Sequence, residues 1–72
     1  MKRYYFVKWL EWDRHAARHI VFHNGFENKA DAMAEFERIE ISLNVPKVQV
    51  WEQLCKNDGF VQAQRRLAIK EF

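Results

Sequence analysis

The amphipathic stretch over residues 26–43 constrains the fold more than any other part of the chain. Its apolar side chains recur at steps of three and four residues, which places them on one face of a helix. Asn28 suits the N-cap position, because its side chain can accept a hydrogen bond from the backbone N–H of Asp31. Pro46 then prevents the helix from continuing. We therefore predict one helix over residues 28–42. Its apolar face would comprise Ala32, Met33, Phe36, Ile39 and Leu43.

The other apolar segments alternate between apolar and polar residues, as strands do. The first of them is rich in aromatic and β-branched residues, which favour strands, and contains no glycine or proline. Asn57, Asp58 and Gly59 form a turn signal between the last two segments, since these residues tolerate left-handed backbone. The chain is then an α+β protein of order ββαββ, with an antiparallel sheet and one helix packed on one of its faces. The predicted strands are residues 3–12, 18–23, 46–54 and 60–70.

Three parts of this interpretation have an alternative. Residues 13–24 could instead form a short helix that ends at Asn24 and Gly25, although the apolar run Ile-Val-Phe within them favours a strand. Residues 60–70 have good helix propensity at their centre. A β-bulge within residues 3–12 would exchange the two faces of that strand part-way along it.

Lys8 decides which face of the sheet the helix covers. Burying its ammonium group without a partner would be costly, so its side of the first strand should face away from the helix. The covered face would comprise Tyr5, Val7, Trp9, Val48, Val50, Leu54, Val61, Ala63, Leu67 and Ile69. The opposite, open face would comprise Tyr4, Phe6, Lys8, Leu10, Trp12, Lys47, Gln49, Trp51, Gln53, Gln62, Gln64, Arg66 and Lys70.

The open face carries the candidate binding residues. Aromatic rings among Lys, Arg and Gln can form a protein interface, which favours Trp, Tyr and Arg at its centre. The same mixture can bind single-stranded nucleic acid, because rings stack on bases and cations bind phosphates. The chain has no dense cluster of Lys and Arg, which favours a protein partner. The candidate residues are Tyr4, Phe6, Lys8, Trp12, Trp51, Gln62, Gln64 and Arg66.

The sequence does not indicate catalysis or metal binding. His15, His19 and His23 recur every four residues, but on a strand this spacing separates successive Cα atoms by about 13 Å, too far for one zinc ion. Cys55 is the only cysteine, and no base or oxyanion pocket is implied near it. With two glycines, the chain has no phosphate-binding loop. We expect no catalytic residue, no metal site and no cofactor, and therefore no enzyme.

Composition bounds the size and the environment of the protein. We expect one domain, residues 1–72, since a chain of this size buries only about 60% of its unfolded surface. The single cysteine excludes an intrachain disulfide, and no apolar run approaches the roughly 18 residues that span a membrane. We therefore expect a soluble, cytoplasmic protein without membrane contact. Aromatic residues make up 15% of the chain, more than one helix can cover on a small sheet, which favours a two-fold homodimer through the open face or a strand edge.

In size and layout the chain is similar to the small single-domain proteins that phages and mobile elements encode, anti-CRISPR inhibitors among them. The similarity carries no residue assignments, but it implies a binder rather than an enzyme. The sequence therefore predicts a non-enzymatic binding protein, an inhibitor of the phage type that blocks a surface of a larger host complex. The alternative is a module that binds single-stranded nucleic acid through the aromatic and basic open face.

Overall fold

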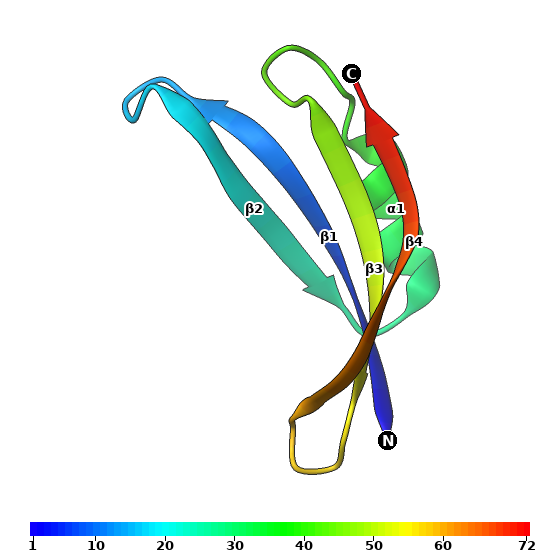
Figure 1. Ribbon diagram of the computed structural model, residues 1–72. Coiled ribbons are helices and arrows are strands. Elements are labelled where there is room, and N and C mark those ends of the chain that lie inside the picture. Colours follow the sequence, from blue (N-terminus) through cyan, green and yellow to red (C-terminus); the bar gives the residue numbers. More distant parts are fainter.

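The computed structural model describes residues 1–72 and consists of four strands and one helix in the order ββαββ (Figure 1). The strands form one antiparallel sheet with the helix on one face, so the expected α+β class and element order are confirmed. The two segments for which a helix was the alternative both form strands. The elements are β1 (Lys2–Asp13), β2 (Arg18–Phe26), α1 (Lys29–Arg38), β3 (Lys47–Cys55) and β4 (Val61–Glu71).

The sheet has the order β2-β1-β3-β4, which leaves β2 and β4 at its edges. β1 pairs with β2 and with β3 in continuous register, so it contains no bulge that exchanges its faces. The Asp13 carboxylate ties the turn between β1 and β2, because its Oδ1 accepts hydrogen bonds from the backbone N–H groups of His15 (2.8 Å) and Ala16 (3.2 Å). The turn between β3 and β4 contains Gly59 at φ 90°, the left-handed backbone that the Asn-Asp-Gly signal predicts.

The helix α1 begins as predicted and ends earlier than predicted. The Asn28 side chain accepts a hydrogen bond from the Asp31 N–H at 2.8 Å, which confirms the N-cap. Ile39 already has extended backbone, so the expected continuation of the helix to residue 42 is wrong. The Ser42 hydroxyl oxygen accepts hydrogen bonds from two backbone N–H groups that follow it, a local turn that competes with the helix. Leu43, expected on the apolar face of the helix, is 76% exposed instead.

The buried core lies between α1 and the two central strands. Val7 of β1 and Val48 and Val50 of β3 are fully buried and belong to one cluster with Ala32 and Phe36 of α1. These strand residues are the ones that were expected under the helix, so the predicted faces of β1 and β3 are confirmed there. The half-buried residues around the cluster include Tyr5, Trp9, Phe26, Met33 and Ile39.

Part of the predicted face assignment in β4 is wrong. Two register shifts against β3 interrupt this strand and leave Gln62 and Leu67 without a paired residue. Each bulge moves the alternation of faces by one residue, and the sequence gives no sign of either. Lys70 therefore lies on the helix side, where its Nζ is 4.9 Å from the Phe36 ring centroid. The residues that change face in this way are Val61, Ile69 and Lys70.

Replacing Phe36 by alanine should lower the free energy of unfolding by about 3–5 kcal/mol, because it removes the largest side chain that α1 buries. Urea unfolding followed by tryptophan fluorescence measures this loss. Phe60→Ala is the matched control, since that ring is 72% exposed, and it should change stability by less than about 0.5 kcal/mol. Equal losses in the two variants would contradict a core centred on α1.

Candidate binding face

The open face, which is the side of the sheet opposite α1, has a stacked pair of rings at its centre. The register places Phe6 of β1, Trp51 of β3 and Arg66 of β4 in one row across the sheet. The Phe6 and Trp51 rings are parallel, with an interplanar angle of 3° and centroids 6.2 Å apart. The Trp51 indole N–H donates a hydrogen bond to Gln49 Oε1 at 3.1 Å. The tryptophan ring is therefore held in one orientation by its neighbours on the sheet.

Cationic side chains lie beside the rings of this face. The Lys8 Nζ is 5.5 Å from the centroid of the Trp51 ring, and the Lys2 Nζ is 5.4 Å from that of Tyr4. The pKa of Lys2 is raised above its ordinary value, mainly because of a hydrogen bond with the Tyr4 side chain. A ring that is approached by a cation offers both a stacking surface and a charge to a ligand.

Glutamine side chains continue the face toward β4. Gln53 of β3 and Gln64 of β4 are paired in the register, and the Gln64 Nε2 donates a hydrogen bond to Gln53 Oε1 at 2.9 Å. The Gln53 Nε2 in turn lies 3.4 Å from the Sγ of Cys55, which is buried and free. This row therefore offers amide donors and acceptors next to the rings.

A hollow opens on this face at Gly25 of β2. Gly25 is paired with Phe6, and because it has no side chain it leaves space beside that ring. A Cβ atom added to Gly25 would meet no other atom within 4 Å. The sequence pattern did not predict this hollow, because Asn24 and Gly25 were expected beyond the end of the strand; a glycine inside a strand is the signal that could have indicated it. The hollow is lined by nine residues, which are Tyr4, Tyr5, Phe6, Lys8, His23, Gly25, Phe26, Glu27 and Gln53.

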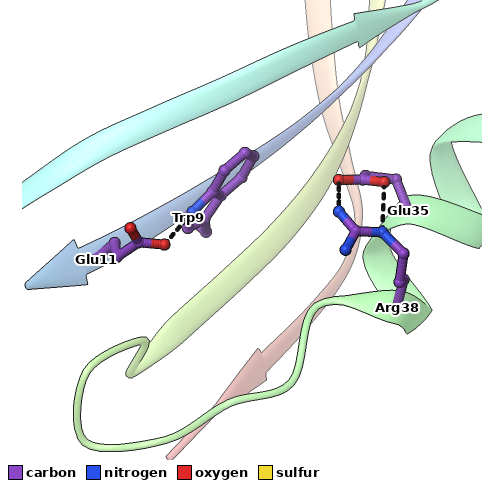
Figure 2. A network of polar contacts seen from close by, with 4 residues as sticks. All are labelled: Trp9, Glu11, Glu35 and Arg38. Atoms are coloured by element: carbon purple, nitrogen blue, oxygen red, sulfur yellow. Dashed lines mark hydrogen bonds and ion pairs between the residues drawn. The ribbon is translucent and has the colours of Figure 1, made fainter.

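The helix side of the sheet carries acidic side chains that bind donors of the same chain. Figure 2 shows Glu35 and Arg38 of α1 in a two-point ion pair, with distances of 2.5 and 3.0 Å. Hydrogen bonding from Arg38 is the main cause that lowers the pKa of Glu35. On the same side, the Trp9 indole N–H donates a long hydrogen bond of 3.4 Å to Glu11 Oε1 (Figure 2). The carboxylates of Glu11 and Glu35 therefore accept hydrogen bonds from donors within the chain.

Charge divides between the two sides of the sheet. By register, the open face carries Lys2, Lys8, Lys47 and Arg66 and one acid, Glu71, and Glu27 adds a second acid at the rim of the hollow. The acids of α1 and of β3 lie on the other side. The open face is therefore positive, and it suits a partner whose matching surface is neutral or acidic.

Most of the predicted binding residues lie together, and two lie apart. Trp12 is on the open face near the turn between β1 and β2, where its ring contacts His19 edge-on at 5.2 Å. Gln62 lies at a register shift, with no paired residue in β3. The residues that share the centre of the face are Tyr4, Phe6, Lys8, Trp51, Gln64 and Arg66.

The histidines do not gather into a site. His19 and His23 lie on β2 and His15 lies in the preceding turn, and no group of three His, Cys, Asp or Glu side chains in the structure could hold a metal ion. The single helix is neither long nor apolar enough to cross a membrane. No protein-family model, curated protein or solved structure matches the chain. The residues of the open face therefore carry the functional proposal.

Gly25→Val should fold with a free energy of unfolding that is higher by about 0.5–1 kcal/mol, because the added side chain meets open space and glycine weakens a strand. Gly59→Val is the matched control. Gly59 has φ 90°, so a side chain there is strained and the variant should lose about 1–2 kcal/mol. Thermal unfolding followed by circular dichroism compares the two. A loss at Gly25 equal to that at Gly59 would contradict the hollow.

Proposed function

We propose that this chain is a non-enzymatic binding protein and that its open face binds a protein partner. The stacked pair of Phe6 and Trp51 carries the proposal. The pair is held in place by a hydrogen bond to Gln49, and no other segment of the chain covers it. Aromatic residues fixed in this way lose little conformational entropy on binding, and they anchor many protein interfaces.

The surroundings of the ring pair also suit a protein interface. The hollow at Gly25 lies beside Phe6 and can receive a side chain of the partner, as interface anchors require. Gln53 and Gln64 offer amide groups for hydrogen bonds at the rim. Arg66 adds a side chain that is enriched at such interfaces.

The dimensions of the molecule fit an inhibitor that acts by covering a surface. The protein measures 40 Å by 23 Å by 15 Å, so it is a thin plate with one broad face free. Stable protein complexes bury roughly 800 Å² on each partner, an area that this broad face can supply. We propose that the bound chain blocks a surface of a larger host complex in the manner of a phage-type inhibitor.

The test is affinity capture from a bacterial lysate, with partners identified and their affinity then measured on purified protein. Trp51→Ala should raise the Kd for a genuine partner by roughly 30-fold, the effect of losing a hot-spot residue worth about 2 kcal/mol. Phe60→Ala removes an exposed ring outside the open face and should leave the affinity unchanged.

Gly25→Val gives a second variant that keeps the fold. It fills the hollow and should weaken the same partner without lowering stability. A partner that wild type, Trp51→Ala and Gly25→Val capture equally would exclude the open face as the binding surface.

Single-stranded nucleic acid is a second candidate ligand, favoured by one specific observation. The ammonium group of Lys8 lies beside the Trp51 ring, which itself stacks on Phe6. A nucleobase stacked on this ring would place its phosphate near the lysine, and Arg66 lies in the same row. The shortage of acids on the open face supports the same ligand.

A salt titration with a labelled oligonucleotide tests this candidate by fluorescence anisotropy. Phosphate contacts make the affinity fall steeply with salt, and Arg66→Gln should reduce the slope of log K against log salt by about 0.7. Trp51→Ala should weaken binding by about 1–3 kcal/mol through the loss of stacking. No binding of any oligonucleotide at about 50 mM salt would exclude this ligand.

A further inference from the structure

We infer that two copies of this chain pair through their β2 edges about a two-fold axis, so that the sheet continues from one copy into the other. The interface is a strand edge and not the open face, so the inference does not depend on the proposed function. In Figure 1 no segment of the chain lies beside the outer edge of β2. A free edge of this kind presents unpaired backbone N–H and C=O groups that a further strand can bind.

The two edges of the sheet differ in how they resist such pairing. β4 carries two register shifts and a row of charged residues, including Arg65, Arg66 and Lys70. Bulges and charges are the devices that protect an edge strand. β2 has neither, since it pairs with β1 in continuous register along its nine residues. Residues 19–26 contain no Lys, Arg, Asp, Glu or Pro. The unprotected edge is therefore β2.

Apolar side chains on β2 remain exposed. Val21 on the open side is 53% exposed, and Phe22 on the helix side is 39% exposed although its ring stacks on Trp9 with centroids 5.9 Å apart. The half-buried Ile20 lies on the same side as Phe22. Pairing two β2 strands would bring these side chains of one copy next to those of the other and remove part of their surface from water.

The ends of β2 favour a second copy over an unrelated strand. Arg18 begins the strand and Glu27 follows its last residue. Antiparallel pairing about a two-fold axis brings the Arg18 end of each copy to the Glu27 end of the other, so residues of opposite charge lie at both ends of the interface. The segment between them is uncharged, so the two copies do not repel one another there.

Because the core of one chain is small, a second copy would stabilise the fold by burying apolar surface of β2. Only six residues of the chain are buried, and none of them lies on β2.

A two-fold axis that relates neighbouring antiparallel strands runs perpendicular to the sheet. Both helices then lie on one side of the extended sheet, and both open faces lie on the other.

Sedimentation equilibrium over a range of concentrations tests the inference. The wild-type mass should rise from 8.8 kDa toward twice that value. Val21→Lys should raise the Kd of dimerisation by roughly tenfold or more, because it places a charge from each copy in the uncharged middle of the paired edge. Val61→Lys is the matched control, since Val61 is 50% exposed on the opposite edge and its replacement should leave the dimer intact. Circular dichroism verifies that both variants are folded.

Hydrogen exchange of the unmodified protein gives a second measurement. The outward amide groups of β2 should exchange more slowly as the protein concentration rises, whereas those of β4 should not change. A mass that stays at 8.8 kDa into the high-micromolar range would overturn the inference. So would a dimer that Val61→Lys disrupts as much as Val21→Lys, or one that Trp51→Ala disrupts instead. Pairing of β2 only with a strand of another protein would overturn it as well.

Discussion

The packing of a ten-residue helix against a four-stranded sheet determines the rest of this structure. The helix buries Ala32 and Phe36 against the central strands, and of β2 it packs only against the end that carries Phe26. Three features of the surface accompany this limited cover by the helix. One whole face of the sheet stays open, the turn between β1 and β2 projects away from the helix, and the edge of β2 is free (Figure 1).

The parts of the fold that depend on neighbouring residues could be predicted from the sequence. The N-cap at Asn28 needs a side-chain oxygen three residues before the N–H that it binds, and the Asn-Asp-Gly turn needs a residue that tolerates positive φ. The open side of β1 followed from Lys8, because a buried ammonium group is costly at any position. From that one residue, the alternation of the strand placed Tyr4 and Phe6 correctly.

The parts that depend on tertiary pairing could not be predicted. The two bulges in β4 arise from its register with β3; one turned Ile69 and Lys70 to the faces opposite to those expected, and the other turned Val61. The apolar pattern of a helix continues to Leu43 in the sequence. The structure instead forms a turn closed by the Ser42 hydroxyl, and α1 ends early. The hollow at Gly25 exists because β1 places Phe6 opposite a glycine, a relation between distant residues.

The candidate site differs from the core in a way that matters for its function. Its rings stand on β1 and β3, the same strands whose opposite sides are fixed by Val7, Val48 and Val50. The backbone beneath the rings is therefore the backbone that the core holds, and the half-buried rings lie outside the buried cluster. Replacing a side chain of the open face should therefore cost less stability than replacing Val7, Val48 or Val50, which are fully buried. The same rings on a loop would be less well fixed, because loops are more mobile than the elements they connect.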